Sequence, residues 1–304
     1  MADEFEGSAT EASGSGSMTG RSAVLPASLR LGHVRLQVGD LARSLDYYTT
    51  VLGLQPGATT ASTAALHADG EALPLVELVE QRGSAPLRAN SRLGLYHFAI
   101  LLPNRAALGR FLEHLVRIGA RLGASDHLVS EALYLRDPDG LGIEVYADRP
   151  RSSWRREHGE LAMATEPLDT ASVIAAGEGE PWTGMPAGTV MGHLHLHVGD
   201  IDRASRFYHD ALGLDPTVWS YPGALFLSAG GYHHHLGVNT WAGRAAAASD
   251  DEARLLEWRM VLPTTGDADA AAGRLRDAGH EVAATPDGWL AIDPWGTRLR
   301  IAAG

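Results

Sequence analysis

Two histidines and one glutamate in the first half of the chain have the types and spacing of a metal site. His33 and His97 each stand early in a predicted strand, and Glu144 lies in the apolar run GIEVY of another. Two neutral imidazoles and a carboxylate on adjacent strands leave open coordination positions, which suits non-haem Fe(II), Mn(II) or Zn(II). We therefore predict a metal site at His33, His97 and Glu144. The alternative is that each histidine is a core residue.

The composition narrows the chemistry further. The 304 residues include no Cys, which excludes disulfides, zinc ribbons, iron–sulfur clusters and thiol nucleophiles. The 14 His and the carboxylates are the side chains left for a metal. A net charge of −12 argues against general binding of nucleic acid, which depends on basic groups.

The N-terminal segment and the apolar runs of the sequence give further expectations. Residues 1–28 are rich in Gly, Ser, Ala and acids without an apolar period, so we predict a disordered tail. The sequence contains no run of about 18 apolar residues, so we predict no membrane span. We expect a cytoplasmic protein.

An internal repeat organises the rest of the chain. Residues 31–40 (LGHVRLQVGD) resemble residues 191–200 (MGHLHLHVGD), and each segment is followed by an aromatic-Tyr pair and Leu-Gly-Leu. His193 thus stands 160 residues after His33, at the same place in the repeat. Period-2 alternation predicts a strand, and Gly-Asp predicts the start of a helix.

A weaker repeat divides each half again. A strand at 96–103, a helix at 105–119 and strands around 134–146 have counterparts at 256–263, 268–278 and 289–301. We therefore predict four units, each a strand, a helix and three strands. The expected fold is α+β with two domains, each a pair of βαβββ modules forming an open, cup-shaped mixed sheet. The predicted domains are 29–150, with the complete metal site, and 189–304, with a linker at 151–188.

The chain resembles the vicinal oxygen chelate superfamily, which includes glyoxalase I, bleomycin-resistance proteins and extradiol catechol dioxygenases. The resemblance spans about residues 30–303. Residues 123–150 (GASDHLVSEALYLRDPDGLGIEVYADRP) resemble the bacterial catechol-2,3-dioxygenase branch. In that family a His in the first strand of one module, a His in the first strand of its partner and a Glu in the partner's last strand bind the metal. The resemblance maps these ligands onto His33, His97 and Glu144.

The same resemblance implies two catalytic residues. Family enzymes keep a Tyr ten residues before the metal-binding Glu, and Tyr134 stands there. A His shortly before that Tyr also lines the site, which implies His127 as the acid–base group, because imidazole titrates near neutral pH. The alternatives are a surface or capping role for His127 and a half-buried strand position for Tyr134.

The activity implied by the resemblance is Fe(II)-dependent extradiol cleavage of a catechol-like aromatic diol by O2, as in aromatic catabolism. Mn(II) and Zn(II) are alternative metals. A glyoxalase-type isomerase or lyase, and a non-enzymatic small-molecule-binding (resistance) protein, are alternative functions. Exposed sheet edges also suggest a homodimer.

The second half has a changed set of residues at the matching positions. His193 aligns with His33, Glu257 with His97 and Arg300 with Glu144. An Arg at a ligand position repels a cation, and we expect Arg300 to pair with Glu257. We therefore predict a degenerate site in the second domain. The alternative is a second pocket that uses His193, His235 and Glu257, because the run YHHH at 232–235 adds imidazoles nearby.

Overall fold

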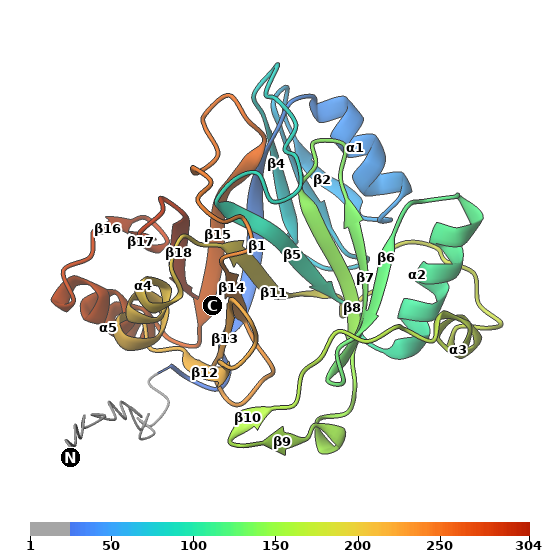
Figure 1. The fold of residues 1–304 in the computed structure, drawn as a ribbon. Coiled ribbons are helices and arrows are strands. Elements are labelled where there is room, and N and C mark those ends of the chain that lie inside the picture. The colour runs from blue at the N-terminus through green and yellow to red at the C-terminus, as the bar shows by residue number, and fades with distance from the viewer. Residues whose placement is uncertain (1–24) are drawn as a thin grey trace, which may run out of the picture.

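A computed structural model describes residues 25–304 and contains two eight-stranded mixed sheets (Figure 1). Most of the predicted tail lies outside the described residues. Its last residues do not follow the prediction, because Leu25 is 3% exposed and belongs to the hydrophobic core. Within the described residues no helix is long and apolar enough to cross a membrane.

The predicted four modules are all present. The first contains β1 (Arg30–Val38), α1 (Leu41–Thr50), β2 (Gln55–Thr59), β3 (Thr63–His67) and β4 (Val76–Glu80). The second contains β5 (Gly94–Leu101), α2 (Arg105–Arg117), β6 (Gly123–Asp126), β7 (Ser130–Arg136) and β8 (Gly142–Asp148). Between the halves lie a short 3-10 helix (Arg151–Ser153), β9 (Arg156–Glu157), β10 (Glu160–Leu161) and α3 (Thr170–Ala176).

The second half repeats the pattern. The third module contains β11 (Val190–His197), α4 (Ile201–Ser205), a π-helical turn (Arg206–Ala211), β12 (Asp215–Val218), β13 (Ala224–Ser228) and β14 (Leu236–Asn239). The fourth contains β15 (Arg254–Leu262), α5 (Thr265–Asp277), β16 (Val282–Thr285), β17 (Gly288–Ile292) and β18 (Arg298–Ala303).

The two copies of the repeat begin their helices in the same way. The carboxylate of Asp40 accepts a hydrogen bond from the amide of Arg43, and Asp200 does the same for Arg203, at 3.0 and 2.6 Å. Each Asp therefore caps the helix that follows the first strand, as the Gly-Asp signal predicts.

The modules pair across the two halves of the sequence. β1 pairs with β15, so modules 1 and 4 share one sheet, in the order β16-β17-β18-β15-β1-β4-β3-β2. β11 pairs with β5, so modules 2 and 3 share the other, in the order β12-β13-β14-β11-β5-β8-β7-β6. We call these sheets the 1–4 cup and the 2–3 cup.

This pairing corrects the predicted domain boundaries. Each cup is a pair of modules, as expected, but the segments 29–150 and 189–304 each contribute one module to both cups. The reason is that all four modules begin with a similar strand, and such strands can join antiparallel in more than one combination. The alternation of apolar residues specifies the faces of a strand, not which partner it takes.

The core lies between the sheets and the helices that cover them. Along β1 the side chains of Val34, Leu36 and Val38 are at most 1% exposed. Figure 1 shows α2 and α3 side by side. Gly109 makes this close approach feasible, because a Cβ there would collide with the carbonyl oxygen of Val173 in α3. The segment between the halves is thus packed against module 2.

Candidate metal centre and its cavity

Three buried side chains of the 2–3 cup converge. His97 comes from β5, Glu144 from β8 and His193 from β11, and their ligand atoms lie within 4.8 Å of one another. The Nε2 atoms of His97 and His193 lie 3.1 and 3.2 Å from the same carboxylate oxygen of Glu144. All three residues are at most 5% exposed. Within the described chain, this is the group that could hold a metal ion.

The strand register explains why these residues meet. Ala99 of β5 is paired with Glu144 on one side and with His193 on the other. His97 stands two residues before Ala99, and residues two apart on a strand point to the same face. Ala99 is fully buried, and its small side chain leaves the space between the three donors open.

The chemistry of these donors fits a divalent metal. Nδ1 of His193 is buried without a hydrogen-bond partner among the described residues, and Nε2 of His97 has only its 3.1 Å approach to Glu144. A buried polar atom without a partner is rare in a folded protein and calls for a ligand or ion. Two imidazoles and a carboxylate are the donor set of non-haem Fe(II) sites, and they also suit Mn(II) and Zn(II).

The protonation states agree with ligand roles. Burial lowers the pKa of both His97 and His193, so both rings are neutral near pH 7. Burial alone would raise the pKa of Glu144, but His193 and His97 outweigh it and hold that pKa well below its usual value. The cluster therefore offers lone pairs on all three side chains.

The structure does not bring His33 to this cluster. His33 lies on β1 in the 1–4 cup, and its Nε2 is 3.8 Å from the carboxylate of Glu77. The equivalent residue of the third module, His193, takes the place predicted for His33. The crossed pairing of modules explains this correction, because the partner of β5 is β11 and not β1.

The second pocket expected from His193, His235 and Glu257 does not form either. Glu257 lies on β15 in the 1–4 cup and is bonded to Arg300 through two contacts of 3.1 and 2.8 Å, which confirms the expected ion pair. Nδ1 of His235 lies 3.0 Å from the hydroxyl of Ser228, which is the buried last residue of β13. The three residues therefore belong to three different environments.

His127 and Tyr134 lie beside the cluster. Tyr134 on β7 is paired with Glu144 on β8, and its hydroxyl donates to Nε2 of His127 at 2.5 Å. The Nδ1–H of His127 donates to the carbonyl of Ala164 at 2.6 Å, which fixes the tautomer. Burial raises the pKa of Tyr134 well above its usual value, so the phenol keeps its proton.

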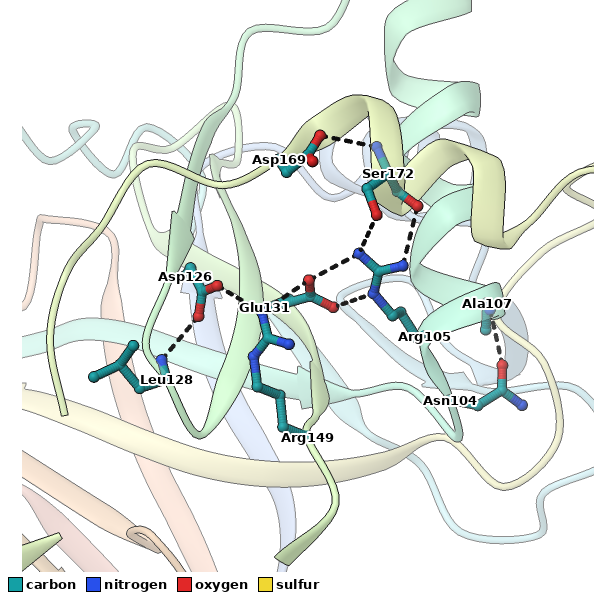
Figure 2. A network of polar contacts seen from close by, with 9 residues as sticks. All are labelled: Asn104, Arg105, Ala107, Asp126, Leu128, Glu131, Arg149, Asp169 and Ser172. Carbon is teal, nitrogen blue, oxygen red and sulfur yellow. Dashed lines mark hydrogen bonds and ion pairs between the residues drawn. The ribbon is translucent and has the colours of Figure 1, made fainter. Parts of the chain in front are cut away.

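A network of ion pairs holds the loop that carries His127 (Figure 2). Asp126 accepts the backbone N–H of Leu128 at 2.8 Å, and Leu128 has a φ of 67°, a conformation that needs such support. Arg149 bonds to Asp126 at 2.5 Å and to Glu131 at 3.2 Å. The hairpin of β6 and β7 is thereby fixed to the end of β8.

The network extends to the helices. Arg105 at the start of α2 binds the buried Glu131 through contacts of 2.6 and 3.0 Å. Its guanidinium also donates to the hydroxyl and the carbonyl of Ser172 in α3. Figure 2 shows these side chains joining the hairpin, α2 and α3. The position of His127 thus depends on the segment between the two halves.

A cavity of about 220 Å³ opens over the cluster. Its lining includes the three donors, His127 and Tyr134, and it adds a set of mostly aromatic residues that sequence reasoning did not single out. These are Tyr96, Ser125, Ser130, Met163, Ala164, Thr165, His195, Tyr221, Phe226, His234 and Trp241. The volume lies below the usual range for drug-sized ligands, so the cavity fits a small molecule.

Two of these histidines had a sequence signal. His195 follows His193 by two residues on β11, so both point to one face, and His234 lies in the YHHH run. His195 accepts a hydrogen bond from the amide of Asn239 at 2.9 Å, and a Cβ at Gly237 would lie 2.9 Å from its ring. Only a glycine leaves room for His195 in this position.

Comparison with known proteins decides the family. The model of the "Glyoxalase/Bleomycin resistance protein/Dioxygenase superfamily" matches residues 30–145 and 190–296. The chain belongs to this superfamily. The predicted resemblance and fold class are therefore confirmed.

Individual relatives match different shares of this superfamily member. It is 44% identical over 268 residues to catechol-2,3-dioxygenase of Bacillus subtilis (strain 168), covering 87% of this chain and 93% of that protein. It is 28% identical over 162 residues to biphenyl-2,3-diol 1,2-dioxygenase 3 of Rhodococcus globerulus, covering 49% and 83%. A solved structure from Bacillus subtilis has a TM-score of 0.60 at 14% identity, covering 90% of this chain and 84% of that one.

Proposed function

We propose that this protein is an extradiol dioxygenase that cleaves the ring of a small aromatic diol with O2. The observation that carries the proposal is the His97, Glu144 and His193 cluster at the base of an aromatic cavity. The 44% identity to a catechol-2,3-dioxygenase over most of both chains supports it. Two imidazoles and a carboxylate leave open coordination positions for a diol and O2.

The proposed metal is Fe(II), with Mn(II) and Zn(II) as alternatives. His97, Glu144 and His193 would hold it, each from a rigid strand. When bound, such a metal supplies a common binding point for both diol oxygens and O2, and a path for electrons between them. The protein's own residues then have three tasks: to orient the ring, to exclude water and to move protons.

The cavity walls favour a neutral, single-ring substrate. The rings of Tyr96, Tyr221, Phe226 and Trp241 provide flat apolar surface. The described residues that line the cavity include no Arg, so no guanidinium there would bind a substrate carboxylate. Aromatic side chains prefer offset or edge-on contact with an aromatic ring, which would orient the diol.

Proton transfer falls to the side chains around the ring. His234 lies against His193, with ring centroids 4.0 Å apart, and is placed to accept a proton from a diol hydroxyl. Tyr134 would hydrogen-bond a substrate oxygen. Its own O–H points to Nε2 of His127 at 2.5 Å, so the Tyr134 oxygen can accept the proton of a diol hydroxyl while its own proton passes to His127. A positioned acid or base contributes roughly 10²–10⁴-fold to a rate.

The direct test is ring cleavage by purified protein. The protein is loaded anaerobically with Fe(II), and with Mn(II) or Zn(II) in parallel, and then mixed with catechol and alkyl catechols under air. We expect a yellow ring-opened product and the uptake of one O2 per ring. His97→Ala should neither bind the metal tightly nor form product.

The same assay separates the alternatives. A glyoxalase-type isomerase or lyase would convert a thiol adduct of a 2-oxoaldehyde without O2 uptake, and a resistance protein would bind aromatic ligands without turnover. Inactivity of the Fe(II)-loaded protein across a panel of single-ring catechols would reject the dioxygenase proposal. The homodimer and the cytoplasmic location stay predictions, the first of which light scattering can test.

A further inference from the structure

A line of three side chains runs from the cavity wall toward the surface. His234 lines the cavity, and its Nδ1 lies 2.8 Å from Nδ1 of His233. Nε2 of His233 lies 2.9 Å from a carboxylate oxygen of Asp148, at the end of β8. We propose that Asp148 and His233 are positioning residues that fix the ring orientation and the tautomer of His234.

The burial of these groups suits a fixed arrangement. The side chain of His233 is fully buried, and that of Asp148 is 26% exposed, so the line has one end at the cavity and one near solvent. His234 packs against the rings of His193 and Phe226, with centroids 4.0 and 4.9 Å away in tilted and edge-on contacts. This packing and the hydrogen bond to His233 both restrict the rotation of the ring.

The tautomers follow from the donors and acceptors. Asp148 is an acceptor only, so Nε2 of His233 carries the proton in their contact. A neutral His233 then has a bare Nδ1, which can only accept, and Nδ1 of His234 must donate to it. The remaining nitrogen of His234, Nε2, is left with a lone pair. The described structure gives His234 no other side-chain hydrogen bond.

This arrangement gives His234 a defined role. An imidazole with a bare nitrogen at the cavity wall accepts a hydrogen bond, and then the proton, from a diol hydroxyl. The opposite tautomer would present an N–H, which can donate to the hydroxyl oxygen but cannot take its proton. In serine proteases the buried Asp sets the tautomer of the catalytic His in the same way, and replacing it by Asn reverses the tautomer. The role of His234 in proton transfer rests on the proposed function, but its tautomer does not.

Neighbouring groups around Asp148 are part of the arrangement. Asp148 also accepts a hydrogen bond from the hydroxyl of Tyr232 at 3.3 Å, and Tyr232 contacts the hydroxyl of Tyr146 at 2.7 Å. The guanidinium of Arg151 lies over the ring of Tyr232, 5.4 Å from its centre. The carboxylate is therefore held from more than one side.

The first test measures the tautomers directly. Protein with ¹⁵N-labelled histidine, saturated with Zn(II) to stay diamagnetic, is examined by long-range ¹H–¹⁵N NMR, and His234→Gln and His233→Gln assign the signals. We expect His234 with a proton on Nδ1 and a bare Nε2, and His233 with its proton on Nε2. In Asp148→Asn we expect both rings to change tautomer. A protonated Nε2 on His234 of the wild type, or unchanged tautomers in Asp148→Asn, would overturn the proposal.

The second test uses turnover and a conservative rescue. His233→Phe removes the contact with His234, and we expect kcat to fall by roughly 10²-fold while KM changes little, because the ring of His234 stays but loses its orientation. His233→Asn keeps an acceptor near the position of Nδ1, so it should recover most of that loss. Equal losses in both variants, or a loss in KM alone, would contradict a positioning role.

One control variant and two possible outcomes for the wild type separate this proposal from the proposed function. Glu77→Gln changes a carboxylate in the 1–4 cup, far from the line, and should leave both the NMR signals and kcat unchanged. If the wild type cleaves no catechol but shows the expected tautomers, the dioxygenase proposal fails and the positioning proposal stands. If it cleaves catechol with the opposite tautomer, the reverse holds.

Discussion

The two cups place different residues at equivalent positions of the same backbone. In the 2–3 cup these positions hold His193, His97 and Glu144, and in the 1–4 cup they hold His33, Glu257 and Arg300. The small Ala99 that pairs with Glu144 has Arg259 as its counterpart, paired with Arg300. One cup therefore gathers lone pairs, and the other gathers ion pairs.

Arginine side chains engage the carboxylates of the 1–4 cup. Arg300 binds both carboxylate oxygens of Glu257 and also bonds to Asp287 at 3.2 Å. Arg259 pairs with Asp287 as well, and Arg35 binds Glu77 through two contacts. A guanidinium repels a cation and offers no lone pair. The comparison teaches that a few side chains, and not the fold, decide which cup can bind metal.

The largest expected difference between the cups is in metal binding and turnover. His193→Ala should lose tight metal binding and lower kcat/KM by roughly 10³-fold or more, because metal coordination supplies several kcal/mol of catalysis. His33→Ala changes the equivalent residue of the other cup and should keep both properties within about twofold. Metal content by mass spectrometry and the catechol assay measure this pair.

The reverse result would break the comparison. If His33→Ala lost the metal and His193→Ala kept it, the metal site would involve the 1–4 cup, against the geometry described above. Circular dichroism of both variants shows whether a loss reflects unfolding.

The next effect concerns stability. Arg300→Met leaves Glu257 as a buried charge without its partner, and we expect a loss of about 3 kcal/mol in the free energy of unfolding. The double variant Arg300→Met with Glu257→Leu should regain most of that loss, because apolar replacement of a buried ion pair is often neutral. Urea denaturation measures both, and metal affinity should not change. A single variant as stable as the wild type would show that the pair contributes little.

The smallest effect is a dependence of stability on pH, and it involves a contact that both halves share. Tyr48 donates to Asp137 at 3.1 Å, and Tyr208 donates to the equivalent Asp293 at 2.8 Å. Burial raises the pKa of Asp137 to about 7. The folded state then holds a proton that the unfolded chain has already released, so stability falls as pH rises toward 7 and levels off above it.

Asp137→Asn tests this sign. Asn cannot ionise and keeps an acceptor for the backbone amides of Asp139 and Leu141. Between about pH 5.5 and 7, the wild type should lose about 2 kcal/mol relative to Asp137→Asn, the slope expected for one proton. A constant difference between the two proteins over this range would show that Asp137 does not titrate there, against the raised pKa.

Two predictions made within one module agree with the structure, and the one that paired β5 with β1 does not. Tyr134 beside Glu144, and Glu257 bonded to Arg300, follow from the order of strands in a single module. The choice of His33 required a partner for β5, and the sequence offers β1 and β11 with nearly the same pattern. The choice of partner strand for β5 depends on the packing of the whole chain, so it cannot be predicted from a local sequence pattern.

The same limit explains the YHHH run. Sequence reasoning chose His235 to face a pocket, whereas the structure turns His234 to the cavity and His235 toward Ser228. These residues precede β14 in a loop, where the alternation of a strand does not apply. His233 contacts Asp148, and His234 packs against the rings of His193 and Phe226, all of which come from other elements.

The crossed pairing has a consequence for how the chain folds during synthesis. β1 pairs with β15, which joins Arg30 to Val261, and the donors Glu144 and His193 lie on opposite sides of the segment between the halves. Contacts between residues so far apart in sequence form late, because a long loop must close first. When only the first half of the chain has emerged from the ribosome, neither sheet is complete. The proposed metal site is therefore complete only after synthesis has passed module 3, whose last strand, β14, ends at Asn239.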